Sequence, residues 1–146
     1  MGRGPKIWSK ATIEQRQLEG RGSGEGMSYQ PWVKVSDFSS LGTSRRVNGL
    51  KINREHHLLS DGEWYLFLLL EWSLDVVDIR EQYPLDRDLT RELALAAGLR
   101  HPCYPRTRIP EVMTVDFLVT LLRARKRTLA AFNVKVESDM NDEGTL

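Results

Sequence analysis

The chain has 146 residues, with 40% apolar and 28% charged residues and a formal net charge of +1, which excludes a uniformly basic protein and fits one globular domain with a buried core. The longest unbroken apolar run, Trp64 to Leu70, is far too short to span a bilayer, so we expect no transmembrane helix and no membrane partner. The N-terminus lacks the apolar segment of a secretory signal, and the single cysteine, Cys103, fits a reducing compartment.

The first third of the chain carries weak signals. Residues 11–19 predict a short helix that ends at Gly20, and the glycine-rich stretch after it predicts a mobile loop. We therefore treat residues 1–30 as an N-terminal helix and arm, and residues 31–146 as the main domain. Residues 44–52 alternate loosely around Asn48 and Gly49, which predicts a hairpin at that dipeptide.

The clearest helix begins near Ser60. Ser60 is followed three residues later by Glu63 and then by an apolar run, which is the signature of a capping box. The helix is apolar nearly all round, so we expect it to be buried, with Trp64, Tyr65 and Trp72 in the core. The Glu63 carboxylate could bond back to the Ser60 backbone, or it could serve instead as a metal ligand.

Two further elements follow before a Pro-rich loop. Residues 73–84 hold Val76, Val77 and Ile79 and stop at a proline, which favours a strand. Residues 86–99 place leucines at helical spacing, with Gly98 near the end, which predicts an amphipathic helix.

The last third predicts two strands joined by the basic loop 123–127. Apolar residues alternate with others along 112–122 and 128–136, as expected of a hairpin. If the chain turns between Ala124 and Arg125, facing residues have numbers that sum to 249. Asp116 then faces Asn133, and Lys135 is a diagonal neighbour on the same face.

This polar patch has two interpretations. Asp116 and Lys135 could form an ordinary cross-strand ion pair on a solvated face. They could alternatively belong to a metal site, because Mg²⁺ prefers one or two carboxylates together with water and phosphate oxygens. Glu63, Asp116 and the backbone carbonyl of Val134 would then be the ligands, and Lys135 would orient or deprotonate a water and stabilise negative charge.

An acid on a helix, an Asp on a strand and a polar-x-Lys pattern on the next strand resemble the PD-(D/E)xK nuclease superfamily. The pattern is short, the proline before Asp116 is absent, and Asn133 stands where an acid is usual.

Longer blocks carry a more specific resemblance. In chain order they are EGRGSGEG, YQPW, HHLLSDGE, LEW, VVDIREQYPL, HPCYP and MTVDFLV, spread over about residues 10–146. They resemble the catalytic domain of the TnsA family, the endonuclease subunits of Tn-seven-like transposases, including the CRISPR-associated ones.

The resemblance implies an α/β fold with a restriction-endonuclease-like core, in which a mixed sheet with a central hairpin is flanked by helices. It implies catalytic roles for Glu63, Asp116 and Lys135, with Asn133 in support. In the family a helix, more sheet and a C-terminal winged-helix domain follow, so we expect the nuclease core here to be incomplete at its C-terminus.

The resemblance also implies an activity and its partners. The activity is Mg²⁺- or Mn²⁺-dependent hydrolysis, with two ions, at the five-prime ends of a cut-and-paste transposon in the bacterial cytoplasm, near the nucleoid. The partners are double-stranded transposon-end DNA, the TnsB recombinase and the AAA+ regulator TnsC, although the family's contact with TnsC lies mainly in the domain missing here.

Candidate DNA contacts form two groups of basic residues, because neutralising phosphates dominates affinity for DNA. They are Arg45, Arg46, His56 and His57 before the helix, and Arg123, Arg125, Lys126 and Arg127 at the hairpin. A zinc site is not expected, since only His101 remains as a further histidine. Two alternatives stay open: a non-catalytic DNA-binding or assembly module with a degenerate nuclease fold, and another restriction-like or junction-resolving nuclease.

Overall fold

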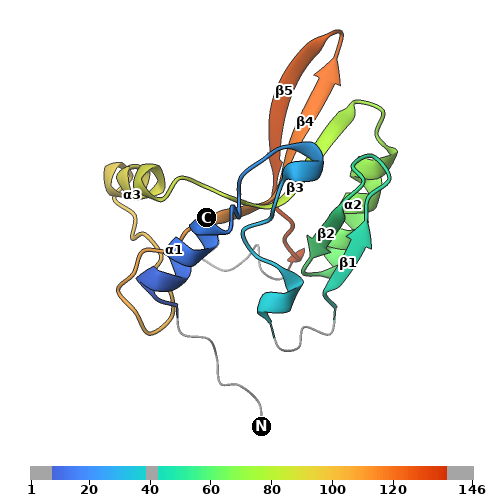
Figure 1. Ribbon diagram of the computed structural model, residues 1–146. Helices are drawn as coiled ribbons and strands as arrows, with labels where there is room; N and C mark the ends of the chain where they lie inside the picture. Colours follow the sequence, from blue (N-terminus) through green and yellow to red (C-terminus); the bar gives the residue numbers. More distant parts are fainter. Residues whose placement is uncertain (1–7, 39–42, 138–146) are drawn as a thin grey trace.

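A computed structural model describes residues 8–38 and 43–137 (Figure 1). The helices are α1 (Lys10–Leu18), α2 (Asp61–Trp72) and α3 (Arg87–Ala96), with short 3₁₀ turns η1 (Gly26–Ser28) and η2 (Val35–Asp37). The strands are β1 (Arg45–Asn48), β2 (Glu55–Leu58), β3 (Val76–Pro84), β4 (Thr114–Arg123) and β5 (Lys126–Phe132). The α/β class and the order of the main elements are as the sequence predicts.

The strands form two small antiparallel sheets. One is the β1–β2 pair, and the other has the order β3-β4-β5. The expected mixed sheet is therefore wrong for the part of the chain that the structure describes. A parallel pair needs a crossover that packs on the sheet, and α3, which connects β3 to β4, buries none of its residues.

The β4–β5 hairpin has the predicted register. Phe117 pairs with Phe132, and Arg123 pairs with Lys126, so the residue numbers of each facing pair sum to 249. Ala124 and Arg125 form the two-residue turn with φ of 48° and 63°, the positive values typical of a type I′ turn. Figure 1 shows this hairpin rising out of the body of the molecule.

The first hairpin differs from its prediction. β1 pairs with β2, and Asn48 faces Glu55. The connection therefore runs through residues 49–54, closed by a bond from the Gly49 N–H to the Arg54 carbonyl, and not through a two-residue turn at Asn48 and Gly49.

The main core lies between α2 and the two sheets. Its buried members are Leu58, Phe67, Leu70, Val76, Ile79, Phe117 and Val119. Among the described residues only one side of α2 has such a partner, so Tyr65 and Trp72 are 62% and 84% exposed. The prediction that both aromatic residues are core residues is wrong, whereas Trp64 does pack against the core.

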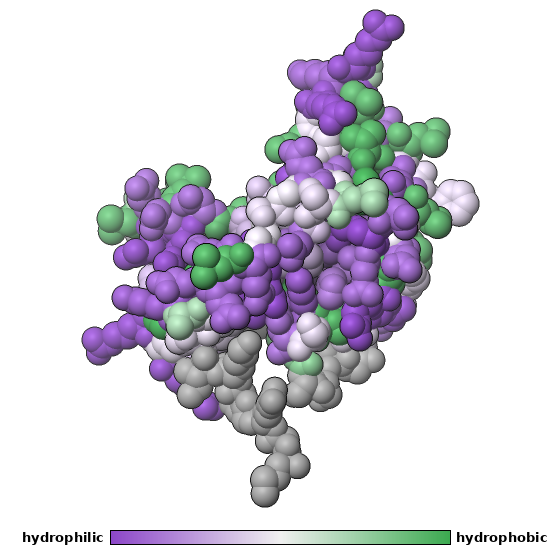
Figure 2. Space-filling model, in the orientation of Figure 1, coloured by the Kyte–Doolittle hydropathy of each residue, from purple (hydrophilic) through white to green (hydrophobic). Residues whose placement is uncertain are grey.

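Helix α3 begins where the sequence predicts but carries an exposed apolar face. The Asp86 side chain accepts a bond from the Leu89 N–H and caps the helix. Leu93 and Leu95 are 60% and 83% exposed, and in Figures 1 and 2 the helix stands away from the body, with green apolar side chains at the surface. None of the helices in residues 8–38 and 43–137 combines the length and hydropathy of a membrane span.

The N-terminal segment builds a second, smaller core. Ile13 on α1 packs with Trp32 and Tyr104, so α1 contacts residues beyond position 30; the domain division at that point stays a prediction. The glycine-rich loop, expected to be mobile, is held against β3: the Gly26 N–H donates to Asp78, and a Cβ at Gly22 would lie 2.3 Å from Pro84.

Candidate active site

The first carboxylate of the candidate site is presented by the start of α2. The Ser60 hydroxyl oxygen accepts the Glu63 N–H at 3.1 Å, which confirms the predicted N-cap. The Glu63 carboxylate is bonded to the Ser60 hydroxyl at 3.0 Å through Oε2 and to the Gln82 amide at 2.5 Å through Oε1. The cap and a carboxylate directed into the fold therefore coexist, since the side chain meets the hydroxyl of Ser60 and β3.

The second carboxylate, Asp116, lies on β4 near the end of the hairpin ladder. Its N–H donates to Asn133 Oδ1 at 3.1 Å, and its Oδ2 accepts the Val134 N–H at 2.7 Å. Asp116 and Asn133 therefore face each other across the hairpin, as the position of the turn predicts. Lys135 is exposed, and its charge acts to lower the pKa of Asp116.

A close contact brings these two carboxylates together. A Cβ placed on Gly62, next to Glu63, would lie 2.6 Å from the Val134 side chain. Only a residue without a side chain lets the start of α2 approach the segment after β5 so closely. Because the Val134 N–H donates to Asp116, this approach brings the start of α2 near enough to Asp116 for its charge to act on Glu63.

The electrostatics of the pair are those of two partly desolvated acids. Burial and then the charge of Asp116 raise the pKa of Glu63 to about 7, although bonds from Ser60, Leu59 and Gln82 act in the opposite direction. Burial also raises the pKa of Asp116. Both carboxyls consequently resist ionising together, and a cation bound between them would favour the charged forms.

The oxygen atoms at this site fit Mg²⁺ or Mn²⁺. These ions use one or two carboxylates and complete their shells with water and phosphate oxygens, and Glu63 and Asp116 provide two partly desolvated carboxyl groups. Within residues 8–38 and 43–137 no group of three or more His, Cys, Asp or Glu side chains gathers as a metal cluster.

Gln82 is a site neighbour that the sequence interpretation missed. It lies on β3 opposite Asp116, because the flanking residues Glu81 and Tyr83 pair with Phe117 and Val115. It is only 3% exposed. The available signal was the polar run Arg80, Glu81, Gln82, which directly follows the buried apolar residue Ile79 inside the strand.

The neighbouring Glu81 belongs to a buried ionic network. It has no exposed surface, accepts two bonds from the Arg54 guanidinium at 2.8 and 2.7 Å, and lies 2.9 Å from Nδ1 of His56. Burial disfavours its charge, but the bonds from Arg54 and His56 lower the pKa of Glu81 to about 2. This network ties β2 to β3 beneath the site.

The two predicted histidine contacts with DNA do not fit this arrangement. His56 is fully buried and packs on the Phe67 ring at 4.8 Å. His57 is 8% exposed, and its Nδ1 accepts the Val35 N–H at 3.0 Å. The burial of both rings argues against the expected phosphate contacts: the contact with Glu81 holds the His56 ring inside, and the Val35 N–H occupies Nδ1 of His57.

The predicted arginine and lysine contacts lie at the surface. Arg45 is bonded to Asp61 at 2.7 Å and covers the Trp64 ring, and Arg46 is exposed. Arg123 pairs with Asp75 at 2.9 Å. Arg125, Lys126 and Arg127, called the tip cluster below, are exposed at the end of the hairpin, where Figure 2 shows hydrophilic side chains.

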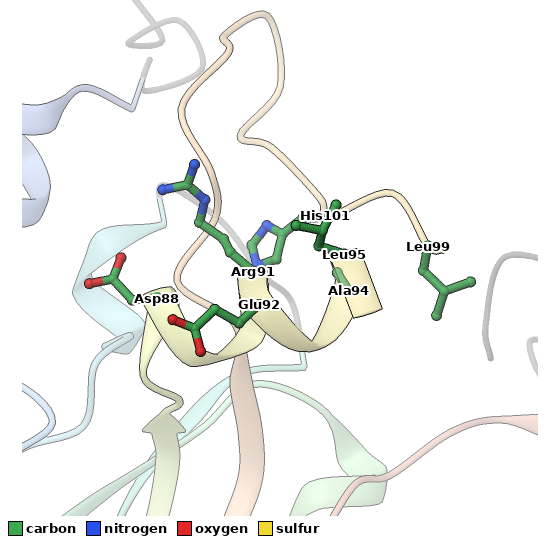
Figure 3. Close-up of a pocket in the computed structure, with 7 residues that line it drawn as sticks. All are labelled: Asp88, Arg91, Glu92, Ala94, Leu95, Leu99 and His101. Carbon is green, nitrogen blue, oxygen red and sulfur yellow. The ribbon is translucent and has the colours of Figure 1, made fainter. Parts of the chain in front are cut away.

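A separate hollow lies beside α3 (Figure 3). Seven residues line it: Asp88, Arg91, Glu92, Ala94, Leu95, Leu99 and His101. None of the predicted site residues is among them, and His101 is bonded to Thr90 at 2.9 Å. This hollow is therefore not part of the candidate site.

Comparison with known proteins identifies the family of the chain. The family model described as "TnsA-like endonuclease N terminal" matches residues 73–146, which include Asp116, Asn133 and Lys135. The chain is also 40% identical over its full length to the Transposon Tn7 transposition protein TnsA of Escherichia coli, of which it covers 52%. It spans about half the length of that relative and includes Glu63 in the matched region. The chain belongs to the TnsA-like endonuclease N-terminal family.

Proposed function

We propose that this chain is the metal-dependent endonuclease part of a transposase, with a restriction-endonuclease-like core that hydrolyses DNA at the five-prime ends of a cut-and-paste transposon. One observation carries the proposal: in a chain of this family, the start of α2 with the buried Glu63 approaches Val134, whose N–H donates to Asp116. The products would be a five-prime phosphate and a three-prime hydroxyl.

The chain's own groups have distinct roles in this proposal. Glu63, Asp116 and the backbone carbonyl of Val134 would hold one or two Mg²⁺ or Mn²⁺ ions. When bound, the metal lowers the pKa of its water and neutralises charge on the phosphate. Lys135 orients or deprotonates the attacking water and stabilises the developing charge. Asn133 supports Asp116 by accepting its backbone N–H.

DNA binding is assigned to the exposed basic residues. The tip cluster projects from the body on the β4–β5 hairpin, and Arg45 and Arg46 lie on β1, just before the strand that leads into α2. These positions suit contact with the phosphate backbone on either side of a scissile bond, and such contacts position DNA without reading its sequence.

The assembly proposed is that of the transposase. TnsB would cut and join the three-prime ends while this chain cuts the five-prime ends, and TnsC is a further possible partner. The site of action would be the bacterial cytoplasm, at the nucleoid.

The test is a nicking assay on a labelled duplex that carries a transposon end, with Mg²⁺ or Mn²⁺ and with TnsB present or absent. Wild-type chain is compared with Asp116→Asn and with Asp88→Asn, a matched control whose carboxylate is exposed on α3. We expect metal-dependent five-prime cleavage that Asp116→Asn abolishes and Asp88→Asn leaves intact. Binding without cleavage in the presence of TnsB would refute the nuclease assignment for this chain.

A second candidate is a non-catalytic DNA-binding or assembly module. Asn133 stands where the superfamily pattern has an acid, and in the described ranges no three His, Cys, Asp or Glu side chains gather. In this case Asp116→Asn would leave DNA binding and complex formation unchanged, and no metal would alter either. A junction-resolving or restriction-type nuclease would instead cut four-way junctions or unrelated duplexes as well as transposon ends.

A further inference from the structure

Gln82 has an unusual backbone conformation for a strand residue. Its φ is +48°, in the left-handed region, where the backbone of a residue with a side chain of this size is strained. Such a conformation persists when neighbouring groups enforce it, and it frequently marks a position where a side chain has to point in a particular direction.

The N-terminal segment holds this conformation in place. The Gln82 carbonyl accepts the Trp32 N–H at 3.1 Å and the Tyr29 hydroxyl at 3.2 Å. The same hydroxyl donates to the Glu81 carbonyl at 2.7 Å. Tyr29 and Trp32 are each only 3% exposed. The Tyr29 hydroxyl proton, shared between two carbonyls, and the Trp32 N–H therefore hold the peptide groups on both sides of the Gln82 Cα.

The Gln82 side chain donates a hydrogen bond to Glu63. Gln82 Nε2 donates to Glu63 Oε1 at 2.5 Å, and the bond is buried. The Ser60 hydroxyl donates to the other oxygen of the same carboxylate at 3.0 Å. These two side-chain donors, one on each oxygen, and the backbone bond from Leu59 set the carboxylate plane, and the carboxylate keeps lone-pair capacity for a further partner.

The chemistry of the donor also matters. An amide carries no charge, so it orients the carboxylate without neutralising it, as an arginine or lysine would. The negative charge of Glu63 is left for a cation, which is the arrangement expected for a group next to a metal ligand.

We propose that Gln82 is a positioning residue that holds the Glu63 carboxylate toward Asp116 for divalent cation binding. The inference rests on the proposed metal-dependent function and adds a residue to it. The strained Gln82 backbone, clamped by Tyr29 and Trp32, then links the N-terminal segment to the geometry of the cleavage site.

The experiment measures Mn²⁺ binding by calorimetry on the full chain, without DNA, so that it does not depend on activity. Four proteins form a double-mutant cycle: wild type, Gln82→Leu, Glu63→Gln and the double variant. Leucine removes the amide while keeping a buried side chain of similar size. We expect Gln82→Leu to weaken Mn²⁺ binding by about 10-fold or more, the usual effect of losing a group that orients a metal ligand.

The cycle separates positioning from general damage to the fold. If Gln82 acts through Glu63, Gln82→Leu has no further effect once Glu63→Gln is present. Gln15→Leu, which changes an exposed glutamine on α1, is the matched control and should bind Mn²⁺ like wild type. Circular dichroism verifies folding, and Gln82→Asn, whose shorter amide tolerates a positive φ, replaces the leucine variant if that protein does not fold.

The outcomes are distinguishable. Wild-type chain that binds no Mn²⁺, or Glu63→Gln that binds it normally, overturns the proposed metal site and this inference with it. Normal wild-type binding combined with equal weakening by Gln82→Leu in both backgrounds overturns the positioning role alone. Gln82→Leu that binds like wild type has the same consequence.

Discussion

The raised pKa of Glu63 predicts an unusual dependence of stability on pH. In the unfolded chain the carboxyl has its ordinary pKa of 4.5, and in the folded protein burial and Asp116 raise it to about 7. Between these two values the folded protein holds a proton that the unfolded chain has released. The free energy of unfolding therefore falls as pH rises through this interval.

The magnitude follows from the size of the shift. One pKa unit corresponds to about 1.4 kcal/mol, so the shift of Glu63 predicts a loss of about 3 kcal/mol by the time the pH exceeds 7. Glu63 is 6% exposed, so solvent screens this effect only weakly. The loss is a sizeable part of the stability expected of a domain of this length.

Urea denaturation of wild type and Glu63→Gln between pH 4 and pH 8, with a chelator present, measures the effect. We expect the difference between the two stabilities to move by about 3 kcal/mol in favour of the variant as pH rises through the interval. Saturating Mg²⁺ at pH 8 should restore stability to wild type but not to Glu63→Gln. Glu92→Gln, a change to an exposed carboxyl on α3, is the control. Parallel pH curves for wild type and Glu63→Gln would refute the reasoning.

Three further predictions concern neighbouring features. Gly62→Ala should reduce Mn²⁺ affinity while leaving the chain folded, because the new methyl displaces the Val134 side chain that it would meet at 2.6 Å; unchanged calorimetry would contradict this contact. Glu81→Gln should lower the free energy of unfolding by about 3–5 kcal/mol in urea denaturation at pH 7, since it leaves Arg54 buried without its counter-charge; a smaller change than 1 kcal/mol would mean that the pair is not desolvated. Replacing all three residues of the tip cluster by serine should weaken binding to any DNA duplex and flatten the slope of log K against log salt by up to about 3; an unchanged slope would place the DNA elsewhere.

Local signals carried much of what could be predicted. The hairpin register followed from the turn at Ala124 and Arg125, because a two-residue turn leaves one way to pair the strands, and this placed Asp116 opposite Asn133. The start of α2 followed from Ser60, since a cap is a contact between residues three apart. The family followed from blocks of sequence that need no structure to compare.

The sequence patterns predicted the burial of several side chains wrongly. The apolar run of α2 predicted a helix covered on all sides, yet Tyr65 and Trp72 are exposed. A periodic pattern reports which side of a helix is apolar, but the number of neighbours around it is a property of the packed chain. The two histidines show the opposite error, since polar residues near a presumed site were expected at the surface and lie inside.

By itself, the sequence determined the elements, the register of the hairpin, the family and the acids to consider. Only the tertiary structure decided how those acids meet. The approach of Gly62 to Val134 and the positive φ of Gln82, held by Tyr29 and Trp32, involve residues 50 to 72 positions apart in the chain. No local pattern encodes such contacts, because each arises from the simultaneous packing of α2, β3 and the N-terminal segment around one carboxylate.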